Sequence, residues 1–307
     1  MSGLRHQALL YEGRDEFLDV ALPFVRDGVA SGDPVIAVVQ TPNLEALREA
    51  LGRDADSVEL RDSSDWYVSP GRSFSGFLGF AAANPSAACV RMIGEPVWPL
   101  EWSAAVAEFA HYESVFNVIA QDSPIVALCP YDVAALPDEV LEHARATHPE
   151  VVVRASAHVS EAFVDPDAYC AHLAGRLSEP VARARGFRVT ADLHDLCLAV
   201  RDEASVAGVR AGSLDELVLA VHQLAANALV HGNGHSSLRT WCDERSFVCE
   251  IESEGGELSE TTAGYAPYDP DGERGRGLWL VRQVCDLVEV RSRGGRTTIR
   301  VHARRAA

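Results

Sequence analysis

The stretch ELVLAVHQLAANALVHG, residues 216–232, constrains the fold of its part of the chain more than any other. Its apolar side chains recur at the three-and-four spacing of one helix face, which predicts an amphipathic helix. Asn227 and His231 lie one turn apart and project from neighbouring positions. Taken alone, this pattern fits a core helix with a polar outer stripe as well as a helix that presents polar groups to a ligand.

A glycine-containing turn further along the chain favours the ligand-binding interpretation. In GERGRGLWLVRQVCDLV, Gly275 and Gly277 precede a second run with helical apolar spacing, which begins at Leu278. Glycine lets the backbone approach an anion closely, and the free N–H groups of a helix N-terminus point toward it. The turn is therefore predicted to face phosphate, with Arg274 or Arg276 available to neutralise its charge.

These elements together resemble the Bergerat-fold (GHKL) ATPase superfamily and, more narrowly, the anti-sigma-factor serine kinases of bacteria, over residues 190–303. The resemblance implies an α+β sandwich that binds ATP or ADP with Mg²⁺, with Asn227 as the Mg²⁺ ligand and Leu258–Glu273 as a lid over the nucleotide. Two pairs of predicted strands and the helices between them fit a helical layer on an antiparallel sheet. The implied nucleotide-binding residues are Asn227, His231, Ser253, Gly255, Arg274, Gly275, Arg276, Gly277 and Leu278.

Two positions depart from the family pattern. Gln223 stands where the family places a carboxylate that acts as general base, and an amide lacks a useful basic lone pair. Its loss costs a proton-transfer contribution of roughly 10²–10⁴-fold. Ser253 stands where an Asp normally accepts from the adenine amino group, so that hydrogen bond is made without charge. No catalytic residue is therefore assigned, and we expect weakened nucleotide binding.

Composition limits the remaining functions. All 27 basic residues are Arg, so no lysine-dependent mechanism is available, and the net charge of −18 argues against direct DNA binding. Seven scattered cysteines without a CxxC pair indicate neither a zinc site nor a disulfide framework; we expect buried small hydrophobes in a reducing compartment. With no secretory segment and no membrane-length apolar run, the chain is predicted to be soluble and cytoplasmic.

The first half of the chain alternates short apolar runs with helical patterns. This alternation, without a GxxxxGK[ST] motif, predicts a mainly parallel sheet flanked by helices that is not a P-loop NTPase. The expected strands are 6–11, 34–39, 58–61, 88–93 and 125–128, and the expected helices are 14–30, 41–51, 74–83, 103–119 and 138–147.

Polar residues in this half gather after predicted strands, in GEPVWP and CPYD, and on the helix between them. Crevices beyond the carboxyl ends of parallel strands are where α/β sheets bind ligands. They predict one small-molecule pocket, although two proline-rich loops that merely turn the chain would give the same pattern. The candidate pocket residues are His6, Glu95, Trp98, His111, Glu113, Tyr131 and Asp132.

The segments HQALLYEGRDEF, IGEPVWP and LCPYDVAALPDEVLEHARATHPE resemble the MEDS (methanogen/methylotroph DcmR sensory) domain over most of residues 4–150. The resemblance implies a sensory input domain with a RecA-like three-layer fold and an unidentified small ligand. We therefore expect two α/β domains, 1–153 and 191–307, joined by a connector with a partial helix at 154–190.

Two functions remain open on this basis. The first is a regulator whose sensory domain controls the binding of a sigma factor or an anti-sigma antagonist by the second domain. The alternative is an active ATP- and Mg²⁺-dependent serine protein kinase, which would need a base that Gln223 does not supply. Relatives of the second domain often form homodimers, which the sequence neither supports nor opposes.

Overall fold

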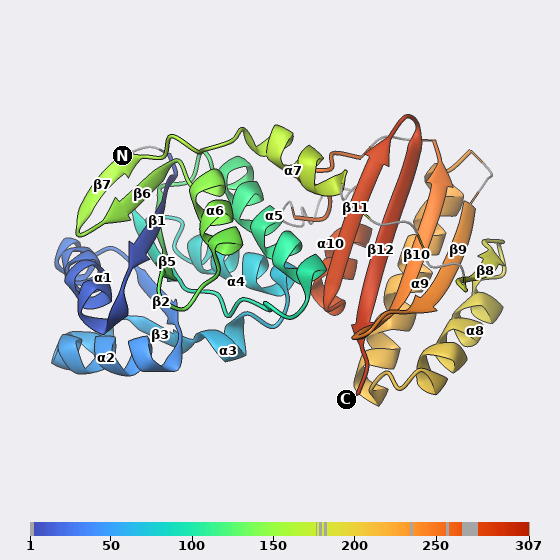
Figure 1. The fold of residues 1–307 in the computed structure, drawn as a ribbon, viewed down its shortest axis with the longest axis horizontal. Coiled ribbons are helices and arrows are strands. Elements are labelled where there is room, and N and C mark those ends of the chain that lie inside the picture. Colours follow the sequence, from blue (N-terminus) through green and yellow to red (C-terminus); the bar gives the residue numbers. More distant parts are fainter. Residues whose placement is uncertain are drawn as a thin grey trace. The chain divides into compact units, whose positions relative to one another are not determined.

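The computed structural model describes residues 3–175, 177, 180, 183–233, 236–255, 258–265 and 276–306. The chain forms two compact units: Met1–Val68 with Arg72–Tyr169, and Cys170–Ala307 with Ser69–Gly71. Each unit contains one β-sheet and its own helices (Figure 1). Within the described ranges, no helix combines the length and apolar character needed to cross a bilayer.

The first unit is built on a seven-stranded sheet with the order β3–β2–β4–β5–β1–β6–β7. All neighbouring strands are parallel except β6 and β7, which confirms the predicted mainly parallel sheet. The strands are β1 (Arg5–Tyr11), β2 (Val35–Val39), β3 (Glu59–Asp62), β4 (Val90–Gly94), β5 (Ile125–Asp132), β6 (Glu150–Val153) and β7 (Ser156–Val159). The helical elements are α1 (Gly13–Ser31), α2 (Thr41–Leu51), η1 (Gly52–Ser57), α3 (Ser63–Trp66), α4 (Pro70–Ala82), α5 (Ser103–Ile119) and α6 (Asp138–Thr147).

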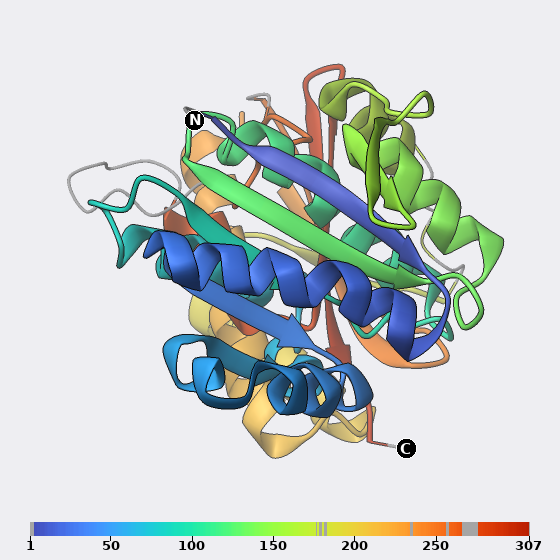
Figure 2. The same ribbon diagram turned by 90° about the vertical axis from the view of Figure 1, so that its left-hand side faces the viewer.

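Helices cover both faces of this sheet (Figures 1 and 2). On one face, Phe17 of α1 and Leu47 of α2 pack with Leu9 and Leu128 of the two central strands. Because side chains alternate along a strand, His6 of β1 and Cys129 of β5 point to the other face, toward α5. The sheet thus carries apolar side chains on the α1 face and brings chemically reactive side chains to the α5 face.

The second unit has a five-stranded sheet with the order β11–β12–β10–β9–β8, in which every pair of neighbours is antiparallel. Its core joins apolar side chains of three helices, including Leu217 and Leu224 of α9, to the helix-facing side chains of β10, Cys249 and Ile251. A helical layer on an antiparallel sheet is the predicted architecture. The elements are α7 (Pro166–Ala174), β8 (Arg185–Arg188), α8 (Leu193–Val206), α9 (Ala211–His231), β9 (Ser236–Cys242), β10 (Ser246–Glu254), α10 (Arg276–Val284), β11 (Leu287–Arg293) and β12 (Arg296–Arg304).

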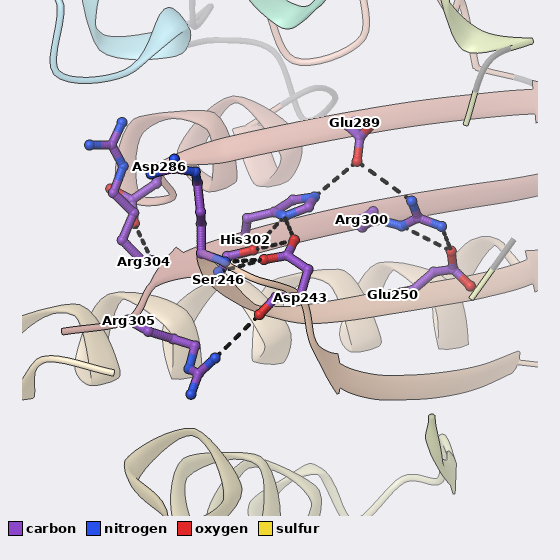
Figure 3. A network of polar contacts seen from close by, with 10 residues as sticks. Asp243, Ser246, Glu250, Asp286, Glu289, Arg300, His302, Arg304 and Arg305 are labelled. Atoms are coloured by element: carbon purple, nitrogen blue, oxygen red, sulfur yellow. Dashed lines mark hydrogen bonds and ion pairs between the residues drawn. The ribbon is translucent and has the colours of Figure 1, made fainter. Parts of the chain in front are cut away.

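The face of the second sheet that points away from these helices carries a chain of charged contacts (Figure 3). Glu250 accepts from Arg300 Nη2 at 2.7 Å, and His302 Nε2 lies 2.9 Å from Glu289 Oε2. On its other side, His302 Nδ1 lies 3.7 Å from Asp243 Oδ2. Burial alone lowers the pKa of His302, but hydrogen bonds with Asp243 and Glu289 outweigh it and raise the pKa above its ordinary value.

The predicted helix 41–51 is α2, which begins at Thr41 after Gln40, and Thr41 Oγ1 donates to Asp62 Oδ2 at 2.6 Å. One local expectation needs correction. The cysteines are not uniformly buried, because Cys242 is exposed and Cys89 is half-buried.

The segment 154–190, expected as a connector with a partial helix, holds more regular structure than that. Besides α7, it contains β7 and β8, which pair at the edges of the first and second sheets. Both strands are short and mostly exposed, so they lack the apolar alternation that marks a strand in a sequence.

Candidate functional site

Gln223 and Asn227 of α9 form the centre of the candidate nucleotide site. Gln223 Nε2 donates a hydrogen bond to Asn227 Oδ1 at 3.2 Å, one helical turn further on. Gly277, in the first turn of α10, lies directly against this pair. A Cβ built on Gly277 would come within 2.7 Å of both Asn227 Nδ2 and Gln223 Nε2. A side chain at position 277 would therefore displace the two amide groups.

The end of β10, which carries Ser253 and is followed by Gly255, lies beside the C-terminus of α9. Ser253 lies two positions after Ile251 on β10, which places its side chain on the helix-covered face of the sheet. Gly255 has φ of 96°, in the left-handed region that favours glycine, and a Cβ there would lie 2.8 Å from Asn233 Cγ. The backbone of Asn233 also donates to Glu254 O at 2.6 Å. The end of β10 is thus bound to the loop that follows Asn227.

The other predicted nucleotide-binding residues have no such contact with the Gln223–Asn227 pair in the part of the chain that the structure describes. His231 is exposed at the end of α9, and Arg276 is exposed at the start of α10. Leu278 is buried in the apolar core of the unit, where it positions the helix and presents no polar group. Arg274 and Gly275 lie outside the described residues.

The described part of the predicted lid, residues 258–265, is a packed turn. Arg282 of α10 stacks over the ring of Tyr265 with 4.0 Å between guanidinium carbon and ring centroid, and its Nε donates to Ala263 O at 2.8 Å. Gly264 has φ of 77° and leaves no room for a Cβ beside Leu278. The remainder of the predicted lid lies outside the described residues, and the lid over the nucleotide stays a prediction.

In the first unit, Glu95 forms the centre of a buried polar cluster beyond the ends of the parallel strands. Its Oε1 accepts from Tyr11 Oη at 2.6 Å, and its Oε2 accepts from the backbone N–H of Gln40 at 2.8 Å. Asn43 Nδ2 lies 2.9 Å from both Glu95 Oε1 and Tyr11 Oη. Burial raises the pKa of Glu95, although the hydrogen bonds that it accepts act in the opposite direction.

A second buried cluster, the His–Glu–Cys quartet, consists of His6 (β1), Glu113 (α5), Cys129 (β5) and His148, the residue that follows α6. Glu113 Oε2 lies 3.3 Å from His6 Nε2, 3.6 Å from His148 Nε2 and 3.8 Å from Cys129 Sγ. Cys129 Sγ lies 3.4 Å from His6 Nε2. All four side chains are of types that coordinate transition metals, and one donor atom from each lies within 4.8 Å of the others.

The surroundings of the quartet determine which nitrogen of each imidazole faces its centre. Asn117 Nδ2 donates to Thr147 O at 2.7 Å, which turns Asn117 Oδ1 toward His6 Nδ1 at 3.1 Å. His148 Nδ1 lies 2.8 Å from the carbonyl oxygen of Ala144. Because both outer nitrogens face acceptors, both donate, and a neutral ring then directs the lone pair of Nε2 inward. Burial and the neighbouring His6 lower the pKa of His148 well below its ordinary value, which favours the neutral ring.

The predicted residues of the sensory pocket therefore do not form one group in the first unit. His6 and Glu113 lie in the quartet, whereas Glu95 belongs to the Tyr11 cluster. His111 faces a different side of α5 from Glu113, since residues two apart on a helix diverge, and its Nδ1 lies 3.4 Å from Glu108 Oε2.

Two aromatic residues lie next to the quartet. Tyr131 meets His148 edge to face with 5.7 Å between ring centroids, and Trp98 lies 6.1 Å from Tyr131. Asp132 accepts from the backbone N–H of Ala134 at 3.0 Å, at the end of β5.

Four residues of the two clusters are not among the predicted site residues. They are Cys129 and His148 of the quartet, and Tyr11 and Asn43 of the cluster around Glu95.

The fold defines a protein of two domains, one with a mainly parallel sheet between helices and one with a helical layer on an antiparallel sheet. Residues 5–149 match the model of the MEDS family, described as the MEthanogen/methylotroph, DcmR Sensory domain. Residues 189–303 match the histidine kinase-like ATPase domain. The chain therefore carries a MEDS domain followed by a histidine kinase-like ATPase domain, which confirms these two resemblances; the narrower one, to anti-sigma-factor serine kinases, stays a prediction.

Two solved structures are similar to parts of the chain. The crystal structure of the RsbU and RsbW domains of Rv1364c from Mycobacterium tuberculosis aligns with 12% identity and a TM-score of 0.31, covering 41% of this chain and 34% of that chain. The chain thus spans about a third of that structure's length. Acinetobacter baumannii histidine kinase AdeS aligns with 12% identity and a TM-score of 0.26, covering 46% of this chain and 76% of that chain. No curated protein matches the chain significantly.

Proposed function

We propose that the chain is a bacterial signalling regulator in which the sensory domain controls an anti-sigma-factor-like domain. The second domain binds a sigma factor or its antagonist protein, and a small ligand held by the first domain changes the affinity of that binding. Such control requires that the ligand bind more tightly to one conformational state than to another. The succession of a MEDS domain and a histidine kinase-like ATPase domain supports this assignment.

The contact between Gln223 and Asn227 carries the proposal that regulation, and not phosphotransfer, is the main activity. A general base must accept a proton, yet the group that Gln223 directs at Asn227 Oδ1 is an N–H donor. The same hydrogen bond engages the oxygen that Mg²⁺ requires. ATP or ADP with Mg²⁺ is therefore bound weakly, through Asn227 and the close approach of Gly277. Mg²⁺, when bound, neutralises phosphate charge.

An active serine protein kinase is the second candidate, because Gly277 keeps the turn at the start of α10 open beside Asn227, where phosphate is predicted to bind. The base would then have to come from elsewhere. Glu216 lies on the same helix but about two turns before Gln223, which is too far to replace it. The kinase function therefore requires a group that α9 does not place near Asn227.

Two measurements test the proposal. Calorimetric titration of ATP and ADP with Mg²⁺ should give binding weaker than about 10 μM that is lost in Asn227→Ala and kept in Glu216→Gln. Each sigma factor and antagonist protein of the source cell is then purified and titrated separately into the chain. For one of them, the affinity for the wild-type chain should change with nucleotide, and the affinity for Asn227→Ala should not. Partner binding that is identical in both proteins would instead indicate a scaffold that no longer uses nucleotide. Transfer of the γ-phosphoryl group to an antagonist by the wild-type chain would establish the kinase.

A further inference from the structure

The hydrogen bonds of the His–Glu–Cys quartet in the first unit indicate that its centre favours a cation. Both histidines donate through Nδ1 to outer acceptors, so two imidazole lone pairs, a carboxylate oxygen and a sulfur atom converge. Among the residues that the structure describes, His148 Nε2 is fully buried without a hydrogen-bond partner. Buried acceptors that face one another are unfavourable unless a cation or a proton lies between them.

The spacing of the donors fits a single metal ion. Metal–nitrogen distances of about 2.0–2.1 Å and a metal–sulfur distance of about 2.3 Å place the donors of a tetrahedral site roughly 3.3–3.6 Å apart. Four of the six separations between the donor atoms of His6, Glu113, Cys129 and His148 run from 3.3 to 3.8 Å, and all six lie within 4.8 Å, so a small contraction brings the group to tetrahedral spacing. A small cavity of about 20 Å³ borders His6, Glu113 and Cys129, which gives space beside three of the four donors.

Outer contacts hold the two imidazoles in the required orientation. Metal-bound histidines almost always donate their second N–H to a carbonyl or carboxylate oxygen, which fixes the ring and its tautomer. Asn117 provides this contact for His6, and the carbonyl oxygen of Ala144 provides it for His148. Asn117 is itself fixed by its bond to Thr147 O. The rings are thus oriented before any ion binds.

We propose that His6, Glu113, Cys129 and His148 bind one divalent transition-metal ion of the zinc class inside the MEDS domain. Two imidazoles, one carboxylate and one thiolate form the mixed nitrogen, oxygen and sulfur donor set that such ions take. The thiolate and the carboxylate cancel the two positive charges, so the buried site is neutral overall. Binding breaks the S–H bond of Cys129, forms the metal–sulfur bond and releases that proton to solvent. The site lies within the first unit and does not depend on the proposed regulatory function.

Cobalt substitution of the full-length chain tests the site directly. After removal of metal with a chelator, Co²⁺ should bind at one ion per chain, with the visible bands of a tetrahedral ion and a near-ultraviolet thiolate-to-metal charge-transfer band. Zn²⁺ should displace Co²⁺ and abolish both. Cys129→Ser should remove the charge-transfer band, whereas Cys89→Ser, which changes a half-buried thiol of the same unit, should retain it.

Two further variants distinguish metal binding at the quartet from metal binding elsewhere on the chain. Asn117→Ala should weaken Co²⁺ binding about 10–100-fold, because the orientation of His6 is lost while all four donors remain. Asn227→Ala should leave the Co²⁺ spectrum unchanged, since the Mg²⁺ position of the second domain is separate. Circular dichroism of each variant verifies folding. A metal-free wild type that shows no Co²⁺ spectrum, or a charge-transfer band that persists in Cys129→Ser, would overturn the proposal and leave a hydrogen-bonded core cluster.

Discussion

Gln223 Nε2 donates to Asn227 Oδ1 over 3.2 Å, so the oxygen expected to hold Mg²⁺ already has a hydrogen-bond donor attached. A Mg²⁺ ion has to displace that donor before it can bind there. The net value of such a hydrogen bond is about 0.5–1.5 kcal/mol, which corresponds to a two- to tenfold loss of affinity.

Gln223→Glu should therefore strengthen Mg²⁺-dependent ATP binding by roughly two- to tenfold, because a carboxylate accepts and does not donate. It should also provide the missing general base and raise any phosphotransfer by about 10²–10⁴-fold. Calorimetry with and without Mg²⁺, followed by a phosphotransfer assay, measures both effects. Glu216→Gln, with the reverse charge change on the same helix, is the control. A Gln223→Glu protein with unaltered Mg²⁺ dependence would show that the hydrogen bond does not limit binding.

Gly277→Ala should impair the nucleotide site, because its Cβ would meet Asn227 and Gln223 at 2.7 Å. Displacing the two amide groups is expected to cost at most about 1 kcal/mol of stability, but it moves Asn227 and should weaken ATP binding about tenfold. Denaturant titration and calorimetry are the measurements. Gly212→Ala, in the first turn of α9 where a Cβ meets nothing within 4 Å, should be neutral or stabilising. Equal effects of the two substitutions would mean that helix propensity, and not the close approach, is responsible.

Tyr11→Phe should destabilise the first unit. The hydroxyl donates to Glu95 and accepts from Asn43, and its removal leaves a buried carboxylate with one donor fewer. The expected loss is about 1–3 kcal/mol. Tyr131→Phe is a matched control on the neighbouring strand, because the Tyr131 hydroxyl is buried without a partner among the described residues. Its removal should be neutral or stabilising in urea unfolding monitored by hydrogen exchange of β1 and β5. The expectation fails if Tyr131→Phe is the more damaging change.

The second unit should lose stability as pH rises above about 6.5, the ordinary pKa of histidine. The folded pKa of His302 is raised, so the folded state retains a proton that the unfolded chain has released. The stabilisation is complete below the unfolded pKa and disappears as pH passes through the folded value, with a slope of at most about 1.4 kcal/mol per pH unit. Hydrogen exchange of β10 and β12 between pH 6 and pH 9 measures it.

His302→Gln should remove this pH dependence, whereas His194→Gln, at an exposed position of α8, should retain it. Asp243 and Glu289 are the charged groups beside the imidazole. Partial burial raises the pKa of Asp243, but hydrogen bonds from His302 and Ser246 outweigh it and lower the pKa below its ordinary value. The stability that Asp243 contributes is therefore lost only at acidic pH. A slope that survives in His302→Gln would assign the titration to another group.

Much of the fold could be predicted from apolar periodicity. The predicted helices 103–119 and 138–147 coincide with α5 and α6, because each has clear helical spacing. β6, β7 and β8 are missing from the predicted strands. β7 and β8 are mostly exposed and lack apolar alternation, and β6 is a short run of four residues soon after the helical pattern of α6. The family resemblance places Gly277 and Asn227 in one nucleotide site, and their direct contact is a finding of the structure.

The His–Glu–Cys quartet could not be predicted from the sequence. Its donors come from β1, α5, β5 and the end of α6, with no short-range spacing of the kind that marks a zinc motif. The apolar neighbours of Cys129 in the sequence indicate only a small buried residue. The register of β1 against β5, in which Ala8 pairs with Cys129, brings His6 to the thiol. Strand register between distant segments is set by tertiary packing and is not readable from either segment alone.

The place of β1 inside the first sheet has a consequence for biosynthesis. β1 leaves the ribosome well before its two neighbours in the sheet, β5 and β6, which are made much later. At about 5–20 residues per second, synthesis from Tyr11 to Ile125 takes roughly 6–23 s. Through that interval the apolar strand has both hydrogen-bonding edges open, and the MEDS domain closes only after Val153 has emerged. Its nascent chain should therefore depend on chaperone protection more than the antiparallel domain that follows it.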